Sequence, residues 1–447
     1  MFMNRSINID KVYVIDDTIH YVIFDNTGFN LFPRRKAEVW VKYHNCEAFD
    51  FKLEKLPLSI LSMPATLYLM HITWLYGVDL IVPAIDKVLN EDLQNIYETY
   101  SRIYGPFKPE WKGKIIAQLI EENKTPELTY DNIIFFSGGV DAIHAAINNC
   151  EDRNVLVTVP SIEWSPSMNK ENTNFNKSKT RLIRDFSAIY GCKWLMVTNN
   201  FRDNLIPETR IPHDFYEILS VTSEAVRNDY CRGLKYVSNL LSSAPFAYAM
   251  GVKKIIMGSG YGEVENIPHI NMDGANPELS DSFKFAGVSF AEQDGLKTRR
   301  SEKVRNIINW CIKKGVKTNI WACFDDSTEQ CGVCHKCVRT QLNILAVSQN
   351  PKNWGFKNFD EKKFTDFVKG YNYNDSKAML WDLFDSIDDS IVYPYCNELL
   401  HWLKKQGYKQ YLQKAVRKKK ILLNLKRIVS IHRYPHFIIE IFKKLMP

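Results

Sequence analysis

Between residues 131 and 260 the sequence alternates short apolar runs with longer stretches at helical spacing. The apolar runs are NIIFF (132–136), VLVTVP (155–160), KWLMVTN (193–199) and KKIIMGSG (253–260). Runs without a polar face predict strands that are buried on both sides, as in a parallel sheet covered by helices. Right-handed crossovers then bring the carboxyl ends of the strands to one edge, where ligands bind. The sequence therefore predicts an α/β fold with a parallel, doubly wound sheet.

Regions with other patterns flank this alternation. Residues 1–50 alternate like strands, with Val39, Val41 and Tyr43 on one face, and residues 57–123 turn to helical spacing. After residue 350 the pattern is again helical. We therefore expect three parts: an N-terminal α+β domain (1–128), the α/β domain (129–349) and a helical extension with a basic tail (350–447).

The composition is that of an ordinary globular protein. Apolar residues make up 45% and charged residues 24% of the 447 residues, which excludes disordered and collagen-like classes. The longest apolar stretch, residues 56–85, is interrupted by prolines and by polar residues, so it predicts a buried helix pair and no membrane span. The first residues lack the pattern of a signal peptide. We therefore expect a soluble, cytoplasmic protein.

The positive charge is concentrated at the C-terminal end. Residues 401–447 contain 13 Lys and Arg against one acid, Glu440, whereas the whole chain has a net charge of +7. The first 400 residues are therefore mildly acidic, and no general polyanion-binding surface follows. A solvated or docked pair of basic helices is the simplest interpretation of the tail. The second interpretation is a contact with a partner protein or a nucleic acid. Nucleic acid is the less favoured of the two, because aromatic residues are few in the tail. Binding to a membrane surface is the last interpretation.

A glycine turn follows the first apolar run. Ser137, Gly138, Gly139, Val140 and Asp141 stand where the predicted strand ends and a helix begins. Two glycines allow a tight turn and a close approach to the backbone amides, and the helix start is electropositive, so the turn predicts an anion cradle. Ser137 can donate its hydroxyl, and Asp141 can hold Mg²⁺. A turn of this kind alone is more often mere chain geometry, and it lacks the Gly-Lys-Ser/Thr of a Walker A loop.

Four of the ten cysteines lie within fifteen residues. They are spaced C-x7-C-x2-C-x2-C and comprise Cys323, Cys331, Cys334 and Cys337. Such a density in a cytosolic chain favours a metal over disulfides. Four thiolates with no open position are typical of a structural Zn²⁺ site, and a [4Fe–4S] cluster is the main alternative.

Together these motifs resemble a known family. FSGGVDA resembles the SGGxDS signature of the PP-loop ATP pyrophosphatases, which have an adenine nucleotide hydrolase-like fold and split ATP between its α and β phosphates. Arg232 resembles the Arg that opens a long helix in that family, and Gly258 in MGSGYGE falls where the next strand meets the nucleotide. Ala142 departs from the family's final Ser and removes one hydroxyl donor to the phosphates.

The cysteine region makes the resemblance more specific. A PP-loop core followed by WACF and CGVCHKCVRTQL resembles QueC, the 7-cyano-7-deazaguanine synthase family, over about residues 130–350. DGANPEL (273–279) and LKTRRSEKVRNII (296–308) resemble the segments that precede the zinc site in that family. The extensions on both sides indicate a QueC-like relative of the kind found in bacterial anti-phage systems, namely Qat (QatC) and type IV CBASS.

The resemblance implies a chemistry and its residues. A carboxylate, here 7-carboxy-7-deazaguanine, is activated by ATP as an acyl-adenylate, and ammonia or an amine of a partner protein then displaces AMP. The partner would bind through residues 1–128 or the basic tail. Asp141 and Ser137 would be catalytic, and the four cysteines would hold Zn²⁺. ATP and Mg²⁺ would be bound by Ser137, Gly138, Gly139, Val140, Asp141, Arg232, Gly258 and Arg300.

Other residues and other functions stay open. Lys297, Arg299 and Arg339 are equally well explained as surface charges, His144 as a core residue, and His269 as a loop residue that faces substrate or solvent. One alternative function is an amidotransferase or thiolase acting on another substrate, such as tRNA or a sugar acid. Another is a nucleotide-binding scaffold subunit whose catalysis is weakened at Ala142.

Overall fold

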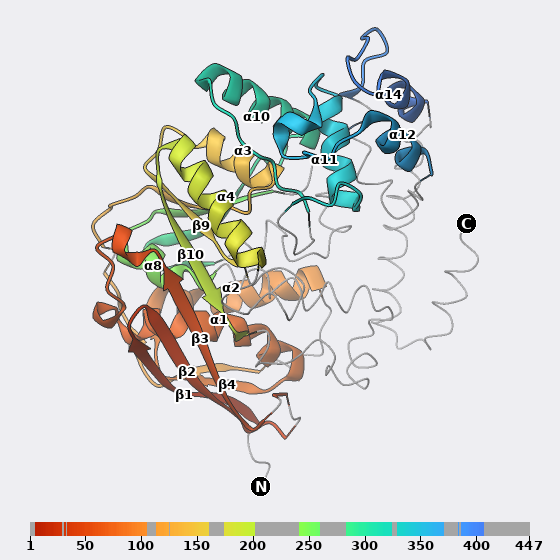
Figure 1. Cartoon of the computed structure of the whole chain (residues 1–447). Helices are drawn as coiled ribbons and strands as arrows, with labels where there is room; N and C mark the ends of the chain where they lie inside the picture. The colour runs from red at the N-terminus through yellow and green to blue at the C-terminus, as the bar shows by residue number, and fades with distance from the viewer. Residues whose placement is uncertain are drawn as a thin grey trace, which may run out of the picture.

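The computed structural model describes residues 5–28, 31–32, 34–104, 113–124, 126–160, 174–201, 241–259, 283–323, 329–370, 383 and 386–405 (Figure 1). The described strands are β1 (Ser6–Ile15), β2 (Thr18–Asp25), β3 (Lys36–His44), β4 (Asp79–Val82), β5 (Ile85–Asp86), β6 (Ile115–Ala117), β7 (Ile120–Glu121), β8 (Asn132–Phe135), β9 (Asn154–Thr158), β10 (Lys193–Asn199), β11 (Lys254–Gly258), β12 (Lys284–Phe285) and β13 (Val288–Asp294). The described helices are α1 (Leu58–Tyr76), α2 (Lys87–Tyr104), α3 (Val140–Asn148), α4 (Asn174–Tyr190), α8 (Ala244–Ala249), α10 (Arg300–Lys314), α11 (His335–Leu345), α12 (Glu361–Gly370) and α14 (Asn397–Lys404), with 3₁₀ turns at Cys46–Ala48, Leu53–Lys55 and Pro351–Trp354.

One large sheet organises the described residues. Its eleven strands run in the order β12-β13-β11-β8-β9-β10-β3-β2-β1-β4-β6. The segment from β13 to β10 is parallel throughout, and it contains the four apolar runs of the sequence. The predicted α/β class with a large, mostly parallel sheet is therefore confirmed.

Alternate residues of the central strands pack into two different cores. Ile133 and Phe135 of β8 face one core, together with residues of α1 and α8. Ile134 and Phe136 face the other core, which contains residues of α3, α4, α10 and α11. Helices thus lie on both faces of the parallel segment (Figure 1), which explains why these strands are apolar on both sides.

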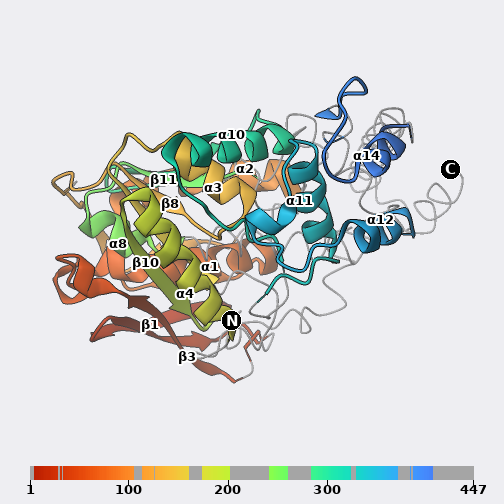
Figure 2. The same ribbon diagram turned by 45° about the horizontal axis from the view of Figure 1, so that its top comes forward.

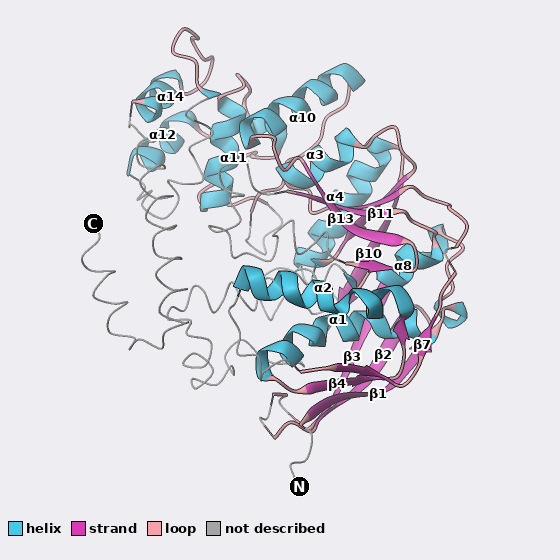
Figure 3. Cartoon of the chain, turned by 180° about the vertical axis from the view of Figure 1, so that it is seen from behind, coloured by secondary structure: helices cyan, strands magenta, loops and turns pink. Residues whose placement is uncertain are grey.

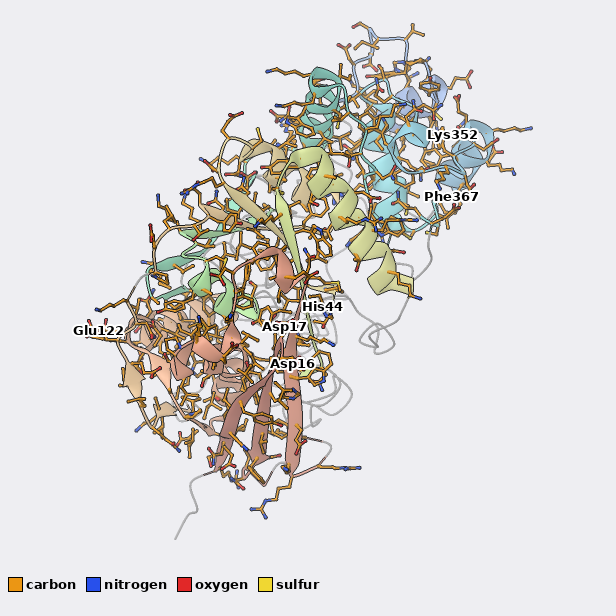
Figure 4. All side chains as sticks on the ribbon, turned by 60° about the vertical axis from the view of Figure 1, so that its left-hand side comes forward. Asp16, Asp17, His44, Glu122, Lys352 and Phe367 are labelled. Carbon is orange, nitrogen blue, oxygen red and sulfur yellow. The ribbon has the colours of Figure 1, made fainter. Side chains whose placement is uncertain are left out.

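The N-terminal strands continue this same sheet. β3 pairs antiparallel with β10, where His44 lies opposite Met196. As predicted, Val39, Val41 and Tyr43 share a buried face, and the Tyr43 hydroxyl donates to the carbonyl oxygen of Ser242 at 2.7 Å. His44, at the end of β3, lies beside the Asp16–Asp17 turn between β1 and β2 (Figure 4). Strands β1, β2 and β3 and the parallel strands therefore share one sheet and one core.

Residues 57–123 are only partly helical. α1 and α2 form as expected. α1 lies over the face of β1 and β4, and α2 packs against β5, β7 and β12 (Figure 3). The expected helix pair over residues 56–85 is instead a single helix, α1, followed by the short strand β4, which pairs parallel with β1. A four-residue strand carries too little local periodicity to be recognised, because its pairing depends on the neighbouring strand.

The helices after residue 335 pack against the α3 face of the sheet. α11, α12 and α14 lie together at one end of the molecule (Figure 2), and Leu399, Leu400 and Leu403 of α14 belong to the same core as α3. No described helix is long and apolar enough to cross a membrane. The basic tail after residue 405, Arg232, His269 and the DGANPEL segment lie outside the described residues.

Candidate functional site

The strand order has its switch point beside β8. From β8 the chain proceeds to β9 and β10 on one side, whereas β11 and β13 lie on the other side. In open parallel sheets the point where the order reverses leaves a crevice at the carboxyl ends of the two central strands, and ligands bind there. Ser137 follows β8 and Ser259 follows β11, so the glycine turn of the sequence lies at this crevice.

The glycine turn is tightly packed on one side. Gly138 has φ +77, a left-handed conformation that favours glycine, and a Cβ there would lie 3.4 Å from side-chain atoms of Leu182 and Trp321. The Trp321 amide donates to the carbonyl oxygen of Gly138 at 2.6 Å, and the ammonium of Lys179 donates to the carbonyl oxygen of Ser137 at 3.0 Å. Ser137 itself is exposed.

Helix α3 begins directly after this turn. Gly139 is its N-cap residue and has an extended backbone, with no side-chain cap. The first amides of a helix lack partners within the helix and carry a partial positive charge. The amides at the start of α3 therefore lie at the crevice, beside the exposed Ser137.

Two buried cations approach the first turn of α3. Arg300 donates to Asp141 Oδ2 at 2.8 Å, and Lys303 donates to Asp141 Oδ1 at 3.2 Å. The exposed fractions of the side chains are 11% for Arg300, 2% for Lys303 and 21% for Asp141. Lys303 also donates to the carbonyl oxygen of Ser259 at 2.5 Å. One ammonium thus joins the residue after β11 to the first turn of α3.

These cations decide the ionisation of Asp141. Burial alone raises the pKa of a carboxyl group, but Arg300, Lys303 and Arg339 outweigh burial and lower the pKa of Asp141 to about 2. Asp141 is therefore a carboxylate at neutral pH and neutralises a lysine that would otherwise be buried without a counter-charge.

Both oxygens of Asp141 are engaged in these ion pairs. A Mg²⁺ ion bound to Asp141 would share this carboxylate with Arg300 and Lys303. Within the described residues, the four cysteines are also the only group of three or more His, Cys, Asp or Glu that is suited to an ion.

Gly258 has a packing role at the same place. A Cβ at this position would lie 2.2 Å from the backbone oxygen of Asp141 and 3.0 Å from the amide nitrogen of Ala142. Glycine is therefore needed for β11 to approach the first turn of α3. Ala142 is itself buried in the core of that face.

The structure brings most of the predicted nucleotide residues together. Ser137, Gly138, Gly139, Val140 and Asp141 form the turn and helix start, Gly258 packs against it, and Arg300 is bonded to it. Arg339 lies within electrostatic range of Asp141. Lys303 was not singled out by sequence reasoning, although it follows Arg300 at the helical spacing that places two residues on one face.

His144 is a core residue, as expected. It is 1% exposed, its Nε2 lies 3.3 Å from Asn306 Nδ2, and its Nδ1 lies 3.3 Å from Asn148 Nδ2 and 3.5 Å from Asp294 Oδ1. These contacts satisfy the ring within the fold. Arg299 is the N-cap residue of α10, and Lys297 lies in the turn before it.

The four predicted metal ligands form one cluster. The sulfur atoms of Cys323, Cys331, Cys334 and Cys337 all lie within 4.8 Å of one another, and those of Cys331 and Cys337 are 3.9 Å apart. A tetrahedral ion with metal–sulfur bonds of about 2.3 Å requires sulfur–sulfur distances of about 3.8 Å. The cluster therefore fits a single metal ion.

The surroundings of the thiols also favour a cation. The Cys334 side chain, burial and the neighbouring Cys323 and Cys331 raise the pKa of Cys337 far above its ordinary value, so four thiolates need a positive ion between them. Backbone amides support two of the sulfurs: the Cys331 amide donates to Cys323 Sγ and the Cys334 amide donates to Cys331 Sγ, both at 3.4 Å. Such outer contacts orient the ligands of a metal site.

Comparisons with protein-family models, with curated proteins and with solved structures found no match to this chain.

Proposed function

We propose that this protein is an ATP-dependent adenylating enzyme of the QueC-like PP-loop type. ATP activates a carboxylate as an acyl-adenylate with release of pyrophosphate, and an amine then displaces AMP to form an amide. The observation that carries the proposal is the meeting of the glycine turn, the start of α3 and Lys303 at the crevice of the sheet. These groups suit a polyphosphate.

Lys303 and Arg300 supply the charge that the reaction requires. An ammonium carries three protons, and among the described residues Lys303 gives two to Asp141 and Ser259. The Lys303 side chain is 2% exposed, so its charge acts on a bound phosphate through electrostatics. Asp141 keeps both cations in place, so we assign it an anchoring role, and Mg²⁺ would be held by the phosphates of the nucleotide.

The proposed substrate is 7-carboxy-7-deazaguanine. This choice rests on the QueC-like sequence of the Cys region, as does the expectation of Zn²⁺ at a structural site. The acceptor is ammonia or an amine on a partner protein, and the setting is anti-phage defence in the cytoplasm. The cysteine cluster is a separate support, because its single-ion geometry suits zinc better than an iron–sulfur cluster.

The test measures pyrophosphate release from ATP with and without 7-carboxy-7-deazaguanine. We expect release that depends on the acid and falls about 100-fold in Lys303→Met, since removal of one fixed donor to a developing charge has an effect of this size. Lys313→Met is the matched control, because Lys313 is exposed at the other end of α10. Release without the acid, or equal rates in both variants, would contradict the proposal.

A further inference from the structure

The glycine turn is held by contacts that originate outside its own strand and helix. Lys179 of α4 is 5% exposed and donates to the carbonyl oxygen of Ser137, and the Trp321 amide donates to the carbonyl oxygen of Gly138. Two successive carbonyl groups are thus drawn toward α4 and the segment before the cysteines.

This arrangement sets the direction of the amides. In a planar trans peptide the C=O and the following N–H point in opposite directions. Because the carbonyls of Ser137 and Gly138 point toward Lys179 and Trp321, the amides of Gly138 and Gly139 point away from them. Consistently, the Gly139 nitrogen lies 3.4 Å from the hydroxyl of the exposed Ser137. The two contacts therefore orient the amides toward the open side of the crevice.

Trp321 is in turn fixed by the cysteine region. The amide of Ala322 donates to Gln330 Oε1 at 2.6 Å, and Gln330 Nε2 donates to the carbonyl oxygen of Ile320 at 2.9 Å. Gln330 thereby clamps the residues on both sides of Trp321, and it directly precedes the ligand Cys331. Cys323 follows Trp321 by two residues.

A second link runs through α11. This helix begins directly after Cys334 and carries Cys337 in its first turn. Arg339 follows on the same helix and is one of the cations that lower the pKa of Asp141. The cysteine cluster therefore determines where two parts of the crevice lie: the backbone of Trp321 and the charge of Arg339.

We propose that metal binding at the four cysteines and polyphosphate binding at the glycine turn are thermodynamically coupled through Trp321. With the metal bound, the 320–323 segment is fixed and the turn amides face the ligand. Without it, Cys323 is no longer tied to the other three cysteines, the 320–323 segment is less firmly fixed, and the hold on Gly138 weakens. The inference rests on the proposed function, in that the turn must bind phosphates.

Coupling of this kind is reciprocal. The factor by which the metal raises the affinity for polyphosphate equals the factor by which polyphosphate raises the affinity for the metal. Coupling between two sites of one protein is typically 5- to 150-fold, and for two sites joined by one short segment we expect about 10-fold.

The experiment uses the full chain loaded with Zn²⁺ and inorganic pyrophosphate as the probe. A chromophoric chelator withdraws the metal with and without saturating pyrophosphate, and the metal affinity should rise about 10-fold when the probe is present. Calorimetry on the loaded protein first establishes the dissociation constant for pyrophosphate and for ATP. If neither binds, the proposed function fails. If they bind and the metal affinity is unchanged, only the coupling fails.

Two variants separate the specific link from a general effect of folding. Gln330→Met removes the clamp on Trp321 and keeps all four thiols. In this variant pyrophosphate should raise the metal affinity by less than about 3-fold. Gln341→Met is the control, because Gln341 donates to the carbonyl oxygens of Gly332 and Cys337 but not to the 320–323 segment. Equal coupling in the two variants would overturn the inference. Circular dichroism checks that each variant is folded.

Discussion

The ammonium of Lys303 lies 3.2 Å from Asp141 Oδ1 and binds the first turn of α3 to the end of β11. Lys303 is almost completely buried and Asp141 largely so, the two charges neutralise each other, and Arg300 adds a second cation to the same carboxylate. The pair therefore has two roles in the fold. It links β11 to α3 at the centre of the sheet, and it holds positive charge beside the glycine turn.

Loss of the carboxylate should destabilise the protein strongly. In Asp141→Asn, Lys303 stays buried without its counter-charge, and breaking a buried pair in this way costs about 3–5 kcal/mol. Urea unfolding at pH 7 measures the loss. Asp131→Asn is the control, since Asp131 pairs with an Arg153 side chain that is 58% exposed, and exposed pairs contribute about 0–1 kcal/mol. A similar loss in both variants would contradict this role of Asp141.

The same ion pairs predict a dependence of stability on pH. The pKa of Asp141 is lowered from 3.8 to about 2 in the folded protein. The contribution of Asp141 to the free energy of unfolding is therefore complete above the pKa of the unfolded state. It is lost as the pH falls through the pKa of the folded state. The difference in unfolding free energy between the native chain and Asp141→Asn should therefore decrease by about 2–3 kcal/mol between pH 5 and pH 2. Urea titrations across that range test this, and a difference independent of pH would count against the ion pairs.

Close packing at Gly258 should tolerate no side chain. In Gly258→Ala the new Cβ would meet the backbone oxygen of Asp141 at 2.2 Å, so β11 and α3 must move apart. We expect a loss of about 1–3 kcal/mol, as for overpacked cores, together with weaker pyrophosphate binding. Gly370→Ala serves as the control, because a Cβ there has nothing within 4 Å. Thermal unfolding and calorimetry compare the two, and retention of native stability by Gly258→Ala would refute the contact.

The sequence was informative where the signal is local. Four apolar runs predicted β8, β9, β10 and β11, because a strand covered on both faces is mostly apolar. The glycine turn was equally readable, since a residue with φ +77 favours glycine. The spacing of the four cysteines predicted a cluster that the structure contains.

The sequence was silent where the signal depends on long-range packing. Lys303 and Asp141 are separated by 162 residues, and only the packing of α10 on α3 brings them together. The joining of β3 to β10 likewise depends on pairing between segments that are about 155 residues apart along the chain, such as His44 and Met196. A single sequence carries no record of such contacts, so the extension of the sheet through the first 44 residues was not foreseen.

Metal content provides the last prediction. The purified chain should hold one Zn²⁺ ion with four sulfur neighbours at about 2.3 Å in X-ray absorption, because the four sulfurs lie within 4.8 Å of one another. Cys337→Ser should lose most of the metal, whereas Cys150→Ser should keep it, as Cys150 lies outside the cluster. Since the cluster fixes the start of α11, chelation should also lower the thermal stability of the native chain. A brown protein that contains iron would instead require thiolates spread around a larger cluster, and the sulfur positions described above would then be wrong.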